Sequence, residues 1–313
     1  MTNVLPDQSK SPVFFAEQQL HSFLAEHYQQ IFTEHHILEG ASFDRDGDLI
    51  FTNPSGGRLM KMTGGGDALV LYTFDEESPA GSAIHQDGRI FLAMMNSDQT
   101  RGRIISLTPD GKVQQDIVSV ERGYVPNDLV FDESGGFYFT DFRGTATDPA
   151  GGVYHVSSDY QVITPVLTHI SLANGVALSP DGLTLWVTEY ARNQLYRLTL
   201  SGPGETQLTS SAITYRFTGP SPDSMRTDQN GNVYVSMMQH GRILIFADNG
   251  VPVSQILLPE REHGRNLDVA SLALCSASRE IIIVAGDISG ASLFMAEGLS
   301  EGTVLYSHCP KYK

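Results

Sequence analysis

The stretch FDRDGDLIF, from Phe43 to Phe51, joins a tight turn to a run of β-prone residues, and this pattern recurs along the whole chain. Its glycine, Gly47, has counterparts at intervals of 41 to 49 residues, with Arg279 in the sixth place. The other copies are IHQDGRIFL from Ile84, FDESGGFYF from Phe131, LSPDGLTLWV from Leu178, TDQNGNVYV from Thr227 and the degraded CSASREIIIV from Cys275. Such a period, with several strands in each copy, is typical of a propeller. Six copies filling the chain predict an all-β, six-bladed β-propeller with about four antiparallel strands per blade.

The repeat places the domain boundary near residue 39. We expect residues 39–313 to form a single propeller domain and residues 1–38 to form an N-terminal extension, with residues 1 to about 14 disordered or extended. Two alternatives remain open for the next segment. Residues 14–30 could form a short helix, or Tyr28–Thr33 could supply the strand that closes the ring. In the third blade we expect four strands, at Asn127–Phe131, Gly136–Asp141, Gly152–Ser157 and Gln161–Leu167.

The charge of the chain is strongly negative. It contains 36 Asp and Glu against 20 Lys and Arg, a formal net charge of −16 at pH 7. Such a surface repels polyanions, so we expect no nucleic-acid partner. No apolar stretch approaches the ~20 residues of a membrane helix, and the N-terminus lacks the pattern of a secretory signal. The chain has two cysteines, Cys275 and Cys309, and the sequence leaves their pairing open. So few cysteines favour the reducing cytoplasm, and we expect a cytoplasmic protein with no membrane partner. The sequence leaves the oligomeric state open.

Oxygen-bearing side chains recur at one position of the repeat. Counting five residues back from the start of each turn gives a set of six residues, four of them Glu, Asn or Asp. The six are Glu39, Ala80, Asn127, Asn174, Asp223 and Ser271. Each precedes the innermost strand of its blade, so all are expected at the same end of the central channel. Taken singly, Asn and Asp before Gly or Ser are more often turn formers, and Asn174-Gly175 fits that interpretation.

Carboxylate and amide oxygens are the ligands that hard divalent cations prefer. Glu39 and Asp223 supply charge, while Asn127 and Asn174 supply neutral oxygens. Because two carboxylates leave coordination positions for water and substrate, the pattern favours a catalytic metal. The absence of a cysteine cluster and of HxH or HExxH spacing argues against a nitrogen and sulfur zinc site. We expect one divalent cation, calcium, with zinc, magnesium and manganese left as alternatives.

Asp141 and Arg143, in the segment FTDFRG, end an inner strand of the third blade. Together with Asn127 they are candidates for substrate binding. The alternative for the first two is an ion pair on the surface.

Four segments of the chain resemble one enzyme family. LEGASFDRDG, VPNDLVFDESGGFYFTDF, LANGVALSPDGLTLWVTE and GPSPDSMRTDQNGNVYV are similar to the family of gluconolactonases, senescence marker protein (regucalcin) and luciferin-regenerating enzyme. FYFTDFRG followed by GGVYHVS is most similar to the calcium-dependent, drug-responsive lactonases of staphylococci. The resemblance implies a six-bladed propeller with a divalent metal in the channel.

The resemblance also implies roles for single residues. It makes Glu39 and Asn174 metal ligands and makes Asp223 both a metal ligand and the general acid and base. Asn127 is a further polar residue near the metal. Relatives of the staphylococcal type carry an aspartate at that position, so the resemblance implies weaker calcium binding in this chain.

Our hypothesis from the sequence is a metal-dependent hydrolase that opens a small-molecule lactone. In it the metal polarises the carbonyl, and Asp223 activates the water and returns the proton to the leaving alkoxide. One alternative is a metal-dependent aryl esterase or phosphotriesterase that uses the same site. The other is a non-catalytic propeller that binds a ligand or calcium.

Overall fold

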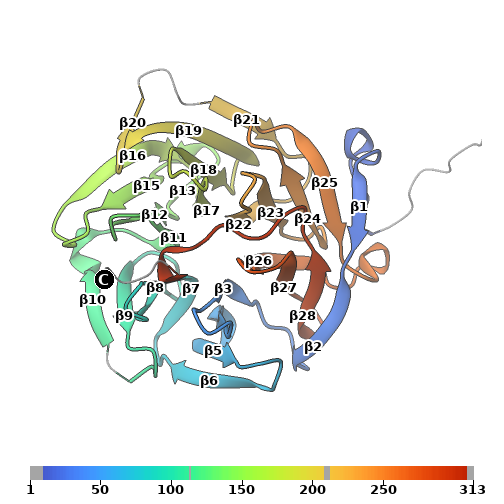
Figure 1. The fold of residues 1–313 in the computed structure, drawn as a ribbon, viewed down its shortest axis with the longest axis horizontal. Coiled ribbons are helices and arrows are strands. Elements are labelled where there is room, and N and C mark those ends of the chain that lie inside the picture. The colour runs from blue at the N-terminus through green and yellow to red at the C-terminus, as the bar shows by residue number, and fades with distance from the viewer. Residues whose placement is uncertain (1–9, 113, 208–211, 309–313) are drawn as a thin grey trace, which may run out of the picture.

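In a computed structural model of the chain, which describes residues 10–112, 114–207 and 212–308, the strands form six sheets arranged as blades around a central axis (Figure 1). The predicted six-bladed β-propeller is therefore confirmed. Blade one consists of β3 (Glu39–Phe43), β4 (Leu49–Asn53), β5 (Arg58–Met62) and β6 (Ala68–Thr73). Blade two consists of β7 (Glu77–Ile84), β8 (Ile90–Asn96), β9 (Gly102–Leu107) and β10 (Gln114–Val118).

The remaining blades follow the same antiparallel order, and in blades three to six the innermost strands are β11, β17, β22 and β26. Blade three consists of β11 (Pro126–Phe131), β12 (Phe137–Asp141), β15 (Gly151–Val156) and β16 (Ile163–Ile170). Blade four consists of β17 (Ala173–Leu178), β18 (Thr184–Glu189), β19 (Gln194–Gly202), β20 (Glu205–Thr206) and β21 (Ala212–Arg216). Blades five and six contain β22 (Pro222–Thr227), β23 (Val233–Met237), β24 (Arg242–Phe246) and β25 (Pro252–Leu257), and then β26 (Asp268–Leu274), β27 (Glu280–Asp287) and β28 (Gly290–Glu297).

The strands of blade three lie within three residues of the predicted bounds. The sequence missed a small hairpin between β12 and β15, formed by β13 (Gly144–Thr145) and β14 (Asp148–Pro149). It extends the loop at the end of blade three where β11 begins.

Residues near the N-terminus complete the last two blades. β2 (Glu26–Phe32) pairs antiparallel with β28 and becomes the outer strand of blade six, while β1 (His21–Leu24) runs parallel to β25 in blade five (Figure 1). Of the two alternatives left open for this region, the structure has the strand; its helical content is one short 3-10 turn, Phe15–Glu17. Of residues 1 to about 14, which we expected to be disordered or extended, residues 1–9 lie outside the described residues, as does Cys309.

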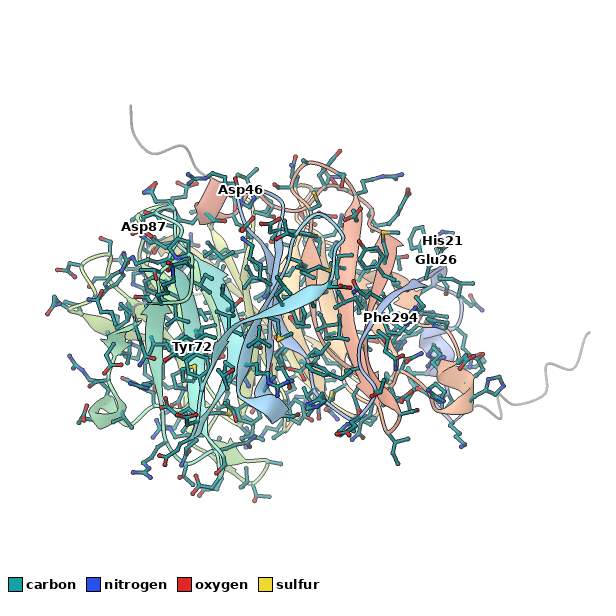
Figure 2. The ribbon with its side chains drawn as sticks, turned by 90° about the horizontal axis from the view of Figure 1, so that it is seen from below. His21, Glu26, Asp46, Tyr72, Asp87 and Phe294 are labelled. Atoms are coloured by element: carbon teal, nitrogen blue, oxygen red, sulfur yellow. The ribbon has the colours of Figure 1, made fainter. Side chains whose placement is uncertain are left out.

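The two faces of the ring differ. The repeated turns lie on one face, where Asp46 and Asp87 mark the turn tips of blades one and two (Figure 2). In five of the six turns a glycine has positive φ, for example 84° at Gly47 and 91° at Gly88, which a residue with a side chain rarely adopts. The inner strands therefore start at the opposite face, which we call the entry face.

The segment from Gly302 to His308 crosses the turn face over the centre of the ring (Figure 1). The Thr303 N–H donates to the Thr227 carbonyl in blade five, and the Arg45 side chain in blade one donates to the Ser307 carbonyl. Between this segment and the inner strands lies a cavity of about 270 Å³, lined mainly by apolar side chains.

Apolar side chains fill the spaces between neighbouring blades. The only tryptophan, Trp186, is buried between blades four and five against Met225 and Val235. Blade six packs on blade one through Val284 and Phe51. The helical segments of the described residues are turns of three residues, and none of them has the length or hydropathy to cross a membrane.

A buried ion pair holds the N-terminal segment on blade five. Arg242 Nη2 lies 2.6 Å from Glu17 Oε2, and both side chains are almost completely buried. The Tyr215 hydroxyl donates to the other carboxylate oxygen, and Arg242 also donates to Gln255. Glu17 thus joins the segment that precedes β1 to β21, β24 and β25.

We expect Glu17→Ala to lower the free energy of unfolding by about 3–5 kcal/mol, because it leaves the Arg242 guanidinium buried without its partner. Arg279→Ala removes the exposed pair with Glu297 and should cost at most about 1 kcal/mol. Urea unfolding of the two variants measures the difference. Equal losses would show that Glu17 contributes no more than a surface charge.

Candidate active site

Each inner strand begins at the entry face with a β-bulge. The register against the second strand shifts between Glu39 and Ser42 in β3, and at the corresponding place of the other five inner strands. The shifts lie at Pro79/Ser82, Pro126/Leu129, Ala173/Val176, Pro222/Met225 and Val269/Ser271. A bulge bends its strand and redirects side chains, so the same irregularity in every blade aims one set of residues at the channel.

The predicted oxygen-bearing residues lie at these bulges. Glu39 opens β3, and Asn127, Asn174 and Asp223 are each the second residue of their inner strand. All four side chains are buried, between 3% and 8% exposed. In blade two the equivalent residue is Ala80, as predicted from the repeat.

The equivalent residue of blade six is Ala270, so the alignment on Ser271 was wrong by one position. The turn of blade six closes with a bond from the Cys275 N–H to the Glu280 carbonyl, whereas the Asp44 turn of blade one closes one residue earlier, at Asp48. The turn of blade four is equally long, from Ser179 to Thr184, but Gly182 marks its place. Blade six has no glycine there, so the count started one residue too late. The Ser271 hydroxyl accepts the Ala41 N–H instead.

Threonine hydroxyls fix the bulges from the neighbouring blade. Thr140 on β12 donates to the Asn174 carbonyl at 2.6 Å, and Thr188 on β18 donates to the Asp223 carbonyl at 2.8 Å. Thr52 on β4 does the same for Ala80. Each of the three is fully buried, and each bond joins the second strand of one blade to the inner strand of the next. The backbone at Asn174 and Asp223 is therefore held at a fixed place in the channel.

Like charges gather at this end of the channel. Burial raises the pKa of Asp223 to about 8, and the negative charge of Asp128 adds to the rise, while Asn174, the Ser224 N–H and Glu39 oppose it. Burial and then the charges of Asp223 and Asp128 raise the pKa of Glu39 well above its ordinary value. The Ser224 hydroxyl lies 3.4 Å from Glu39 Oε2, and a Cβ on Gly175 would lie 2.5 Å from the Asp223 carbonyl oxygen. The inner strands that carry Glu39, Asn174 and Asp223 therefore meet at this point of the channel.

Two oxygens of this group have no hydrogen bond. Asn174 Oδ1 and Asp223 Oδ1 are both buried, and no donor within the described residues reaches either of them. A buried acceptor without a donor is costly unless a cation or water fills the place. Oxygen atoms of this kind, beside a second carboxylate, suit a divalent cation. Glu39, Asn174 and Asp223 therefore fit the expected metal.

Asn127 shares the position of the other residues but not their contacts. It is buried on β11, and its side chain makes no hydrogen bond to Glu39, Asn174 or Asp223 in the described structure. Its backbone carbonyl faces Gly81 of blade two, where a Cβ would approach to 2.6 Å. The geometry therefore places Asn127 beside the group through its strand alone.

The sequence did not single out Asp128 or Arg226. The two form an ion pair in which Nη1 lies 3.4 Å from Oδ2. Asp128 follows Asn127 within the bulge and is fully buried. Arg226 lies three residues after Asp223 on β22. An aspartate next to a candidate ligand and an arginine within the same inner strand were the available signals.

Asp141 and Arg143 form the predicted ion pair, but Asp141 is buried rather than on the surface. Its carboxylate accepts the Val125 N–H at 2.9 Å and binds the Arg143 guanidinium. Burial raises the pKa of Asp141, and Arg143 opposes the rise. Glu189 accepts the Ser171 N–H in the same way in blade four. Asp141 thus shapes the loop before β11, and the Arg143 side chain, 37% exposed, remains a candidate for substrate contact.

Two aromatic side chains, Tyr190 and Phe142, lie near the carboxyl groups of the site. Tyr190 follows β18, and the negative charges of Asp223 and Glu39 reinforce the effect of burial in raising the pKa of its hydroxyl. Its ring meets Phe142 edge-on, with centroids 5.8 Å apart. Phe142 in turn packs against Ala80 and Met95. The entry face therefore combines one polar group with an apolar border.

Comparison with known proteins identifies relatives of this chain. The sequence profile of the SMP-30/Gluconolactonase/LRE-like region matches residues 39–265. Lactonase drp35 of Staphylococcus saprophyticus is 39% identical over 307 residues, covering 96% of this chain and 95% of that protein. Lactonase drp35 of Staphylococcus aureus (strain USA300) is 38% identical over 294 residues, covering 92% and 91%.

A solved structure has the same fold at low identity. The calcium-binding protein regucalcin from Agrobacterium tumefaciens superposes with a TM-score of 0.72 at 18% identity, covering 90% of this chain and 96% of that one. The family resemblance inferred from four sequence segments is thus confirmed. The chain belongs to the SMP-30/gluconolactonase/LRE-like family.

Proposed function

We propose that this protein is a metal-dependent lactonase whose active site is the group formed by Glu39, Asn174 and Asp223. The observation that carries the proposal is the pair of buried oxygens, Asn174 Oδ1 and Asp223 Oδ1, that lack donors beside the buried carboxyl of Glu39. The lactonase names of two relatives that match nearly the whole chain support the reaction class. Calcium is the ion we propose, because every candidate ligand is an oxygen.

The three residues hold the ion, and Asn127 lies at the next bulge, where it can bind substrate or a bound water. When bound, the cation polarises the lactone carbonyl. Asp223 takes a proton from the water that attacks the carbonyl carbon. As the ring carbon–oxygen bond breaks, Asp223 gives that proton to the leaving alkoxide, so the product is a hydroxy acid. Thr188 keeps the Asp223 backbone in place throughout.

The substrate we propose is a small lactone that reaches the group from the entry face. Arg143 and Asn127 are proposed to contact its polar atoms, with Tyr190 and Phe142 against its apolar part. A metal and a general base can also promote attack of water on other esters. Aryl esters and phosphotriesters are therefore the alternative substrates.

Removal of the metal should abolish hydrolysis. We expect protein stripped with EDTA to be inactive towards a panel of lactones, and calcium to restore turnover more fully than magnesium, manganese or zinc. Aryl esters and a phosphotriester are assayed in parallel. If either is hydrolysed faster than every lactone, the proposed substrate class is wrong. If folded protein is inactive with every ion, the proposal that the protein is a hydrolase is wrong.

Asp223→Asn should lower the rate of lactone hydrolysis by about 10²–10⁴-fold, since it removes the proton acceptor and one charge of the metal site. Asp248→Asn is the matched control, because Asp248 is an exposed residue on the same blade. Steady-state rates of both variants at saturating calcium measure the effect. A rate near that of the unmodified protein in Asp223→Asn would assign the proton transfer to another group.

The raised pKa values of Glu39 and Asp223 predict a pH dependence of stability. Between pH ~4 and the folded pKa of Asp223, about 8, the native metal-free protein holds protons that the unfolded chain has released. Its free energy of unfolding therefore falls as the pH rises through this window. Urea unfolding should show this fall in metal-free protein and a smaller one in Glu39→Gln/Asp223→Asn or with calcium present. Identical slopes in all three samples would contradict it.

A further inference from the structure

We propose that Arg226 is an internal counter-charge that makes this site select divalent over trivalent cations. The inference rests on the metal site of the proposed function. It goes further, because it names the residue that sets the charge of that site.

Arg226 is fixed in the channel by more than its ion pair. Its Nη1 donates to the Met225 carbonyl at 2.7 Å, and its Nη2 donates to the Ala41 carbonyl in blade one at 3.1 Å. Its side chain is only 13% exposed. Because two backbone carbonyls hold the guanidinium, it stays at this place when the charge of Asp128 changes.

Asp128 is fixed as firmly. The Leu129 N–H donates to its Oδ1 at 2.9 Å, and the Val176 N–H in blade four lies 3.5 Å from its Oδ2. Its position in the bulge beside Asn127 brings its charge within reach of both Glu39 and Asp223. Arg226 acts on Glu39 and on Asp128 with the opposite sign. The four groups form one electrostatic unit built from blades one, three and five.

The charges of this unit explain the preference. Glu39, Asp128 and Asp223 carry three negative charges when a cation keeps them ionised, and Arg226 carries one positive charge. The unit therefore has a net charge of −2, which we call a deficit of two positive charges. A divalent ion balances that deficit, whereas a trivalent ion leaves one positive charge uncompensated in a buried place. Without Arg226 the deficit becomes three, and a trivalent ion fits it better.

The test compares the dissociation constants of calcium and terbium, measured by calorimetry and by terbium luminescence. In Arg226→Met we expect both ions to bind more tightly and the ratio of terbium to calcium affinity to rise by about tenfold or more. In Asp128→Asn we expect the ratio to fall, since the deficit drops to one. Arg226→Lys keeps the charge and should keep the ratio.

Two further variants separate charge from structural damage. Asp128→Asn/Arg226→Met restores the deficit of two and should return the ratio to that of the unmodified protein. Arg242→Met breaks a buried ion pair remote from the channel and should lower stability without changing the ratio. If Arg226→Met does not fold, the Asp128→Asn result decides. An unchanged ratio in the folded single variants would overturn the role of Arg226, whereas failure of the unmodified protein to bind either ion would overturn the metal site itself.

Discussion

The hydrogen bonds that threonine hydroxyls make between neighbouring blades are the interaction on which the channel geometry depends. Thr140 and Thr188 each bind the backbone carbonyl at a bulge of the next blade, and that bulge aims Asn174 or Asp223 into the channel. A bulge leaves backbone groups without partners in the strand ladder, so a buried hydroxyl beside it replaces the missing bond. Residues far apart in the sequence thereby gain fixed relative positions from short, repeated contacts.

The same geometry forces carboxyl groups together. In an apolar interior, neighbouring carboxylates raise each other's pKa, and the protein avoids the cost by retaining protons or by binding a cation. Burial is the largest cause of the raised pKa values of Glu39 and Asp223, and the negative charge of Asp128 adds to both. The Asp128–Arg226 pair is the part of this arrangement that the protein itself neutralises. What remains is a place suited to a mobile cation and to an acid–base group beside it.

The sequence predicted the features that repeat and missed those that depend on contacts between blades. The glycines of five turns revealed the repeat. The offset from each turn found Glu39, Asn127, Asn174 and Asp223 because each lies four residues before the last residue of its inner strand. The offset failed in blade six, where no glycine marks the turn, and Ser271 was taken in place of Ala270. It also could not find Asp128 and Arg226, since their pairing joins strands nearly one hundred positions apart.

The helix-or-strand alternative near the N-terminus shows a second limit. Glu26–Phe32 has no strong pattern of its own, and it becomes a strand because β28 offers an open edge. Local sequence cannot reveal an edge that is supplied by the far end of the chain.

The pairing of β2 with β28 has a consequence for folding during synthesis. β2 is the second of the described strands in chain order, and its partner β28, Gly290–Glu297, is the last of them. Until β28 has been synthesised, β2 lacks this partner, and blade six is incomplete. Contacts so distant in sequence slow folding, and open strand edges invite association with other chains. The nascent chain therefore keeps an open strand edge, able to pair with another molecule, until β28 is available.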